Sequence, residues 1–129
     1  MIVVDTSAVV AIVLGEPDSE RFRDALEHAT VAISAASVTE ARMVLDSRRG
    51  GDAVRDLTEL LEVCEATVTP YDEAHALAAH AAWRRFGKGR HPAQLNMGDC
   101  MAYATAKLAD SPLLFKGEDF PQTDITPVL

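Results

Sequence analysis

The stretch VVDTSAVV, residues 3–10, sets a carboxylate between two apolar runs. Residues 2–4 are apolar without alternation, which is typical of a parallel strand that is covered on both faces. Residues 6–14 continue as a short helix. Asp5 should therefore end a core strand, at the edge of the sheet where open α/β folds bind their ligands. Its alternative role is that of an N-cap for the helix that follows.

The size and charge of the chain limit the classes of protein to which it can belong. With 129 residues, of which 48% are hydrophobic, it can bury one substantial core, and we expect a single domain over residues 1–129. Twenty acidic against twelve basic residues give a formal net charge of −8. This balance argues against a protein that coats nucleic acid by bulk electrostatics, so a contact with a polyanion would need a local basic patch or bound cations.

Cysteine content and hydropathy indicate the compartment. Cys64 and Cys100 are too few and too scattered for a zinc site or a disulfide framework, and they predict buried free thiols in a reducing compartment. No apolar run approaches the roughly 18 residues of a membrane span, and the first residues lack a basic leader. We therefore expect a soluble cytoplasmic protein with no membrane partner.

Short apolar strands alternate with longer helical stretches along the chain. The predicted strands are residues 2–4, 30–34, 66–70 and 112–115, and the tail DITPVL is a candidate edge strand. The predicted helices are residues 6–14, a stretch from Pro17 to about His28, SVTEARMVLDSRR, DAVRDLTELLEV, EAHALAAHAAWRRF and MGDCMAYATAKLA. This alternation predicts an α/β fold, a three-layer α/β/α sandwich with a mainly parallel central sheet of four to five strands.

Most acidic residues fall on polar helix faces and predict no function. Asp99 differs, because Ala102, Tyr103 and Ala106 follow it at helical spacing and place it in line with an apolar stripe. Its side chain should point inward. The alternative is a first-turn acid that caps the helix together with Asn96.

Two further acids are weaker candidates when each is considered alone. Glu40 lies on the flank of the apolar stripe of its helix, although a glutamate on a helix surface is common. Asp119, with Glu118 beside it, follows the last predicted strand, where turn chemistry explains an aspartate equally well.

The four candidates gain weight as a set. Asp5 and Asp119 should lie near carboxyl ends of strands, and Glu40 and Asp99 near the starts of helices, so all four could converge on one edge. Such a cluster is unfavourable when bare, because like charges raise one another's pKa. A hard divalent cation, Mg²⁺ or alternatively Mn²⁺, removes that cost. The hydroxyls that follow Asp5 could add a ligand or hold its carboxylate by a hydrogen bond; they belong to Thr6 and Ser7.

The segment WRRFGKGRH, residues 83–91, contains four basic residues and no acid. We interpret it as a candidate phosphate-contacting rim for RNA, formed by Arg84, Arg85, Lys88 and Arg90. Alternatively, the cations only complement the dipole of a helix that ends there. Trp83 and Phe86 are expected to pack in the core rather than to stack on bases.

The motifs VVDTSA, SVTEARMVL, LNMGDCMAYATAK and LLFKGEDF together resemble the PIN-domain ribonucleases, and most closely the VapC toxins of VapBC toxin–antitoxin pairs. The resemblance spans essentially the whole chain. It implies that Asp5, Glu40 and Asp99 are the acids of a metal site, with Asp119 nearest to the fourth. In many relatives that fourth acid or an asparagine falls two places earlier, where this chain has Gly117.

The resemblance also implies an activity and its partners. These are Mg²⁺-dependent endonuclease action on RNA by metal-activated water, a 5′-phosphate product, inhibition by a cognate VapB-type antitoxin, and a homodimer. Two other interpretations stay open from the residues alone. In one, Asp5 is the acceptor in phosphoryl transfer, although the second acid that some phosphatases need two residues later is here Ser7. In the other, the chain is a non-catalytic module that binds RNA or a protein partner.

Overall fold

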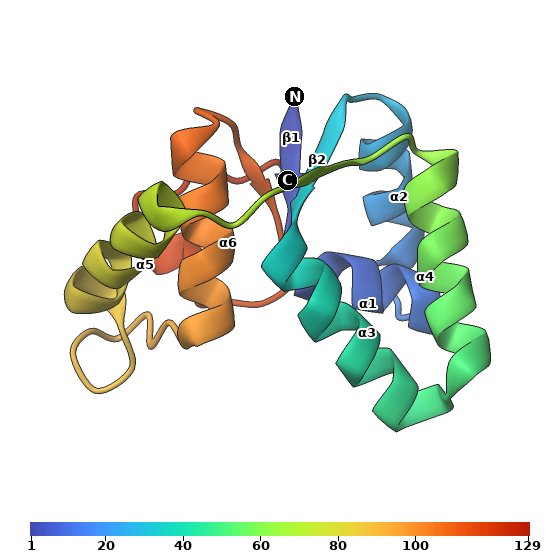
Figure 1. Ribbon diagram of the computed structural model, residues 1–129, viewed down its shortest axis with the longest axis horizontal. Coiled ribbons are helices and arrows are strands. Elements are labelled where there is room, and N and C mark those ends of the chain that lie inside the picture. Colours follow the sequence, from blue (N-terminus) through green and yellow to red (C-terminus); the bar gives the residue numbers. More distant parts are fainter.

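A computed structural model describes residues 1–129, and its parallel sheet separates two groups of helices (Figure 1). In chain order the elements are β1 (Ile2–Val4), α1 (Thr6–Leu14), α2 (Ser19–Glu27), β2 (Val31–Ser34), α3 (Ala35–Arg49), α4 (Gly51–Val63), β3 (Thr67–Thr69), α5 (Glu73–Phe86), α6 (Met97–Leu108), β4 (Leu113–Leu114) and a 3₁₀ turn η1 (Phe120–Gln122). Every predicted helix is present. The second begins two residues after Pro17, and Gly50 separates α3 from α4 as predicted.

The sheet has four strands in the order β3-β2-β1-β4, and every pairing is parallel. The tail adds only an isolated bridge between Leu113 and Pro127, so the candidate edge strand in DITPVL is not formed. Two backbone hydrogen bonds make this bridge, from Leu113 N to the Thr126 carbonyl and from Val128 N to the Leu113 carbonyl, and β4 itself is only two residues long. The predicted parallel α/β fold is confirmed, with four strands.

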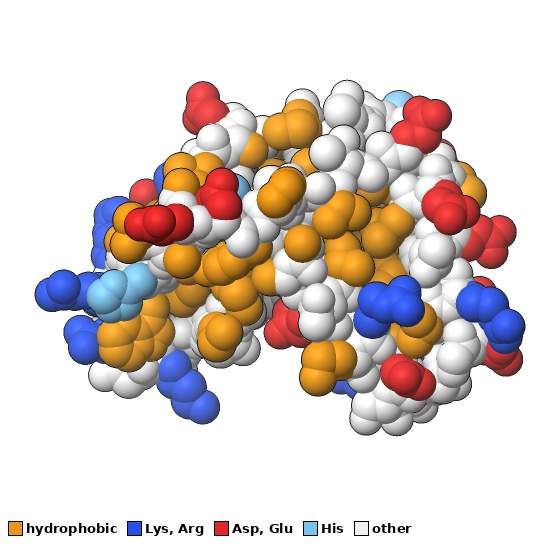
Figure 2. All heavy atoms as spheres, viewed as in Figure 1, with side chains coloured by type: hydrophobic (Ala, Val, Ile, Leu, Met, Phe, Trp, Pro, Cys, Tyr) orange, Lys and Arg blue, Asp and Glu red, His pale blue; other side chains and the backbone are white.

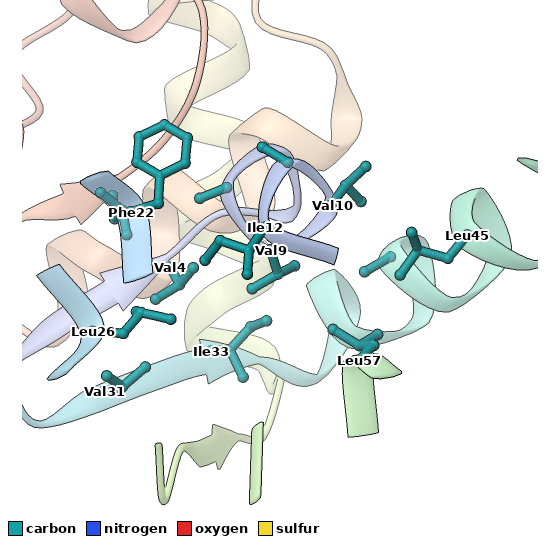
Figure 3. Close-up of a cluster of buried hydrophobic side chains, with 14 of the residues drawn as sticks. Val4, Val9, Val10, Ile12, Phe22, Leu26, Val31, Ile33, Leu45 and Leu57 are labelled. Atoms are coloured by element: carbon teal, nitrogen blue, oxygen red, sulfur yellow. The ribbon is translucent and has the colours of Figure 1, made fainter. Parts of the chain in front are cut away.

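Successive side chains of each strand point to opposite faces of the sheet, so two hydrophobic cores form, one on each face. Ile2 and Val4 of β1 pack into a cluster with α1 to α4, whereas Val3 packs with α5 and α6. Leu114 and Leu113 of β4 divide in the same way. Figure 3 shows the first cluster, in which Val4, Val9 and Ile33 lie close together between the strands and α1. The three layers therefore follow from side-chain direction in buried strands.

The order of the strands determines where a ligand site can lie. From β1 the chain proceeds to β2 and β3 on one side, and it later returns to place β4 on the other side of β1. The connections thus change direction between β1 and β4, and such a switch point opens a crevice beyond the carboxyl ends of the strands. Asp5 directly follows β1, and the segment 115–119 follows β4.

The structure also bears on the predictions for the cysteines and for membrane-spanning helices. Cys100 is buried and Cys64 half-buried, and both are free thiols. None of the helices has the length and apolar character required to cross a bilayer.

Candidate active site

Asp5 is buried, with 4% of its surface exposed, at the point where β1 becomes α1. It is the N-cap of α1, and its Oδ2 accepts hydrogen bonds from the backbone N of Ser7 at 3.0 Å and from Ser7 Oγ at 2.5 Å. Burial raises the pKa of Asp5 to about 6; the Ser7 bonds oppose the rise, and the charges of Asp99 and Glu40 add to it. Asp5 therefore caps a helix and also faces two other acids.

The hydroxyls beside Asp5 connect elements around it. Ser7 Oγ accepts a hydrogen bond at 2.9 Å from the backbone N of Lys116, which lies just beyond β4. Thr6 Oγ1 donates to the carbonyl of Ser37 in α3 at 3.3 Å. Ser7 thus links the Asp5 carboxylate to the end of β4, and Thr6 links the first turn of α1 to α3.

Asp99 occupies the first turn of α6 in a capping box. Its backbone N donates to Asn96 Oδ1 at 2.9 Å, and its Oδ2 accepts from the backbone N of Asn96 at 3.0 Å. Burial raises the pKa of Asp99, its bond with Asn96 lowers it, and the charges of Asp119 and Glu40 raise it further. The capping alternative for Asp99 is therefore present, in a half-buried group that also lies near Asp119 and Glu40.

Glu40 projects from α3 toward the first turn of α6, against which α3 packs. A Cβ placed on Gly98 would lie 2.9 Å from Glu40 Oε1 and closer still to Oε2. This close approach requires a residue without a side chain at position 98. It does not depend on a backbone angle that only glycine adopts. Gly98 therefore lets the Glu40 carboxylate lie directly against the residue that precedes Asp99.

Asp119 and Glu118 are both exposed in the segment after β4. Of the two, Asp119 is close enough to Asp99 to raise its pKa. The Glu118 carbonyl accepts a hydrogen bond from Gln122 Nε2 at 3.2 Å, and its carboxylate affects neither Asp99 nor Asp5. Of the two neighbours, Asp119 is therefore the one whose charge acts on Asp99.

The four predicted acids share one region, and none of them pairs with a cationic side chain. The ion pairs of the protein all involve other residues. No three His, Cys, Asp or Glu side chains are gathered tightly enough to hold a metal ion together. Ligation by three of these acids would require side-chain rotation, which exposed Asp119 and half-exposed Glu40 can make. Because the donors are all carboxylate oxygens in a region of uncompensated negative charge, they fit a hard divalent cation.

The sequence did not reveal Lys116 as part of this region. Its backbone N binds Ser7, and its side chain pairs with Glu16, at the far end of α1. A backbone donor has no side-chain signature, so no motif could have identified it. The one available signal was its place directly after a strand end.

The predicted basic rim divides into one paired and three free cations. Arg85 binds Asp124 at 3.3 Å, while Arg84, Lys88 and Arg90 are exposed and have no acidic partner. Their segment joins the end of α5 to the start of α6 in Figure 1. Phe86 is buried as predicted. The core assignment of Trp83 was wrong, because 37% of its surface is exposed.

Known proteins resemble this chain in sequence over nearly its whole length. The family model described as PIN domain matches residues 2–125. The chain is 46% identical over 127 residues to Ribonuclease VapC30 of Mycobacterium tuberculosis, covering 98% of this chain and 97% of that protein. It is also 46% identical to Ribonuclease VapC of Mycolicibacterium smegmatis, covering 98% of both chains.

The chain belongs to the PIN-domain family, among the VapC ribonucleases. Solved structures agree with this VapC-type PIN fold. The sarcin-ricin loop cleaving toxin VapC20 of M. tuberculosis superposes with a TM-score of 0.79 at 17% identity, covering 99% of this chain and 98% of that one. FitAcB of Neisseria gonorrhoeae superposes with a TM-score of 0.70 at 27% identity, covering 98% and 96%. The resemblance to VapC toxins that the motifs indicated is confirmed.

Proposed function

We propose that this PIN-domain protein is a divalent-metal-dependent endoribonuclease, the toxin of a type II toxin–antitoxin pair that inhibits translation or growth by hydrolysing RNA. One observation carries the proposal. Four acids from separate elements lie in one region beyond the carboxyl ends of β1 and β4 without a cationic partner, in a chain that is 46% identical to named VapC ribonucleases. Carboxylates this close together repel one another, and a cation bound between them removes that repulsion.

The residues that would hold Mg²⁺, or alternatively Mn²⁺, are Asp5, Glu40, Asp99 and Asp119. A divalent ion bound there would lower the pKa of a water molecule and neutralise charge on the scissile phosphate. Ser7 would keep the Asp5 carboxylate in place through its two hydrogen bonds, and Thr6 would support the same turn through its bond to α3.

The site contains no side chain that is poised as a nucleophile. The Ser7 hydroxyl donates to Asp5 and accepts from Lys116, so it is held away from a substrate. Water would attack phosphorus, and the bond to the 3′ oxygen would break with a proton transferred to that oxygen. The products would be a 5′-phosphate and a 3′-hydroxyl.

The phosphoryl-transfer alternative has less support from the site. The position two residues after Asp5 is Ser7, which binds the Asp5 carboxylate instead of supplying a second acid. The binding-module alternative is tested by calorimetry, because a module whose acids only cap helices should not bind Mg²⁺.

A protein antitoxin is the second proposed partner. Solved structures of the same fold include a toxin–antitoxin complex from Klebsiella pneumoniae. A region of uncompensated carboxylates suits an inserted arginine, whose guanidinium binds carboxylate through two parallel hydrogen bonds. Homodimer formation and a cytoplasmic location remain predictions.

The decisive experiment incubates the purified protein with RNA and Mg²⁺, or with EDTA, and sequences the cleaved ends. We expect cleavage with 5′-phosphate ends that depends on the metal and is lost in Asp99→Asn, since asparagine can still accept the capping bond. Asp46→Asn, an exposed acid on α3, is the matched control and should cleave normally. Cleavage in EDTA, or by Asp99→Asn at the wild-type rate, would contradict the proposal.

A further inference from the structure

A hollow of about 320 Å³ lies between α5 and α6. Its lining is mainly hydrophobic and includes Tyr71, Ala79, His80, Trp83, Met97 and Cys100. Figure 2 shows hydrophobic side chains gathered over α5 and α6, with Lys and Arg side chains along their outer margin. The catalytic proposal does not use this surface.

Trp83 is held at the margin of the hollow in a defined position. The Arg90 guanidinium lies over its ring, 4.2 Å from the centroid, and the His80 ring stacks beside it at 6.0 Å and 20°. A Cβ on Gly87 would overlap the indole, 2.9 Å from Nε1, so the glycine leaves space for the ring against the loop. The indole is therefore positioned before any ligand arrives.

The charges at the Trp83 end of the hollow suit a polyanion. Arg84, Lys88 and Arg90 have no acidic partner, although the protein as a whole carries a charge of −8. A guanidinium that stacks on an aromatic face keeps the N–H groups in its plane available for a phosphate. Aromatic faces beside such cations are the features with which proteins bind single-stranded nucleic acid.

The first turns of α6 connect the hollow to the acids. Met97 and Cys100 are three residues apart and line the hollow, whereas Asp99 lies on the other flank of the helix and faces Glu40. An α-helix with its side chains is about 10 Å across, so a strand whose phosphate lies at the acids reaches the hollow within about one or two nucleotides. The position thus suits a base that flanks the cleaved bond.

We infer that the hollow between α5 and α6 binds an unpaired base of the RNA, with Trp83 in contact with the base and Arg90 and Lys88 on its phosphates. The inference rests on the proposed ribonuclease function and adds a subsite to it. A hydrophobic hollow with aromatic walls accepts a base only when that base is free of a duplex. The substrate class is therefore RNA with single-stranded nucleotides next to the cleaved bond.

The first test uses the fluorescence of Trp83, the only tryptophan of the chain. An unstructured oligoribonucleotide should quench its emission in the Asp99→Asn protein, which leaves the RNA uncut. Inorganic polyphosphate, which binds Arg90 beside the indole but has no base, should change Trp83 emission less than the RNA does. RNA that binds, as shown by the anisotropy of a labelled oligonucleotide, without changing Trp83 emission would overturn the inference.

The second test compares cleavage by Trp83→Ala, Trp83→Phe and Leu108→Ala. Loss of one stacked base corresponds to a rise in KM of roughly fivefold or more for Trp83→Ala, with kcat little changed. Trp83→Phe retains an aromatic face and should recover most of the affinity. Leu108 is a half-exposed residue at the other end of α6, and its variant should resemble wild type.

The outcomes distinguish this inference from the function on which it rests. If wild type cleaves RNA and Trp83→Ala does so with an unchanged KM, the subsite is refuted while the ribonuclease function stands. If wild type cleaves no RNA, the function itself fails. If Trp83 emission changes with protein concentration in the absence of RNA, and sedimentation shows association, the surface binds a second copy and the inference is overturned.

Discussion

Gly98 and the Glu40 carboxylate are in direct contact where α6 begins beside α3, so that no Cβ fits between them. The contact joins two acids of the candidate site, because Asp99 follows Gly98 in the same turn. The position of Glu40 thus depends on a residue that carries no chemistry of its own.

Gly98→Ala should reduce cleavage by about 10- to 100-fold while leaving the fold intact. The new methyl group displaces the Glu40 carboxylate, and a shift of about 1 Å in a reacting group has consequences of this size. Stability to urea should change by no more than about 1 kcal/mol, because alanine is favoured over glycine in a helix. Gly51→Ala, at the start of α4 with open space around it, is the control and should cleave normally. Wild-type cleavage by Gly98→Ala would show that the Glu40 position is immaterial.

Asp5 should make the metal-free protein less stable as pH rises. Burial raises its pKa from 3.8 to about 6, so the folded state binds the proton more tightly than the unfolded state does. The free energy of unfolding should therefore fall between about pH 4 and pH 6 by up to about 3 kcal/mol. Urea unfolding in EDTA should show this slope in wild type and in Asp46→Asn. Asp5→Asn should reduce the slope to the part that comes from the raised pKa of Asp99, and it should be more stable at pH 7; an unchanged slope would contradict the assignment.

Asp119→Asn and Glu118→Gln form a matched pair of neighbouring substitutions. Asp119 lies near enough to Asp99 to raise its pKa, whereas Glu118 does not. Asp119→Asn should lower cleavage at limiting Mg²⁺ by about 10- to 100-fold, with partial recovery at high Mg²⁺. Glu118→Gln should remain close to wild type. The reverse order, measured as the dependence of cleavage rate on Mg²⁺, would make Glu118 the fourth acid.

Removal of Lys88 and Arg90 should weaken the dependence of RNA binding on salt. Each phosphate contact with single-stranded nucleic acid contributes about 0.7 to the slope of log affinity against log salt, so Lys88→Ala/Arg90→Ala should lose about 1.4. Arg85→Ala should lose less, because Arg85 already pairs with Asp124. An equal double change on the exposed end of α3, Arg48→Ala/Arg49→Ala, is the control. Parallel slopes for the double variant and wild type would exclude these cations from the RNA contact.

Ser7→Ala should destabilise the protein and impair cleavage together. The substitution removes a hydrogen bond to Asp5 and leaves the backbone N of Lys116 without its acceptor, at a cost of about 1–3 kcal/mol. Urea unfolding and cleavage rate measure the two effects. Ser47→Ala, an exposed serine on α3, should alter neither. Full activity in Ser7→Ala would mean that Asp5 needs no positioning by Ser7.

The elements of the fold were predictable because their signals are local. Apolar runs without alternation marked the strands, Gly50 marked the break between two helices, and Asn96 with Asp99 marked the start of α6. The tail forms a single bridge to β4 instead of the candidate strand, since an apolar pattern does not report over how many residues two segments pair. Trp83 was mispredicted for a related reason: helical spacing gives the direction of a side chain and not what covers it.

Sequence alone determined which segments form helices and strands, the order of these elements and the carboxylate character of the candidate metal ligands. These features depend on the residues themselves and on interactions between residues close together in the chain. Only the tertiary structure decided that Gly98 admits the Glu40 carboxylate, that Ser7 is held by a backbone group of Lys116, and that Trp83 remains at the surface. Those relations join residues that are far apart in the chain. They are set by the packing of α3, α5 and α6 about the sheet, which no single stretch of residues contains.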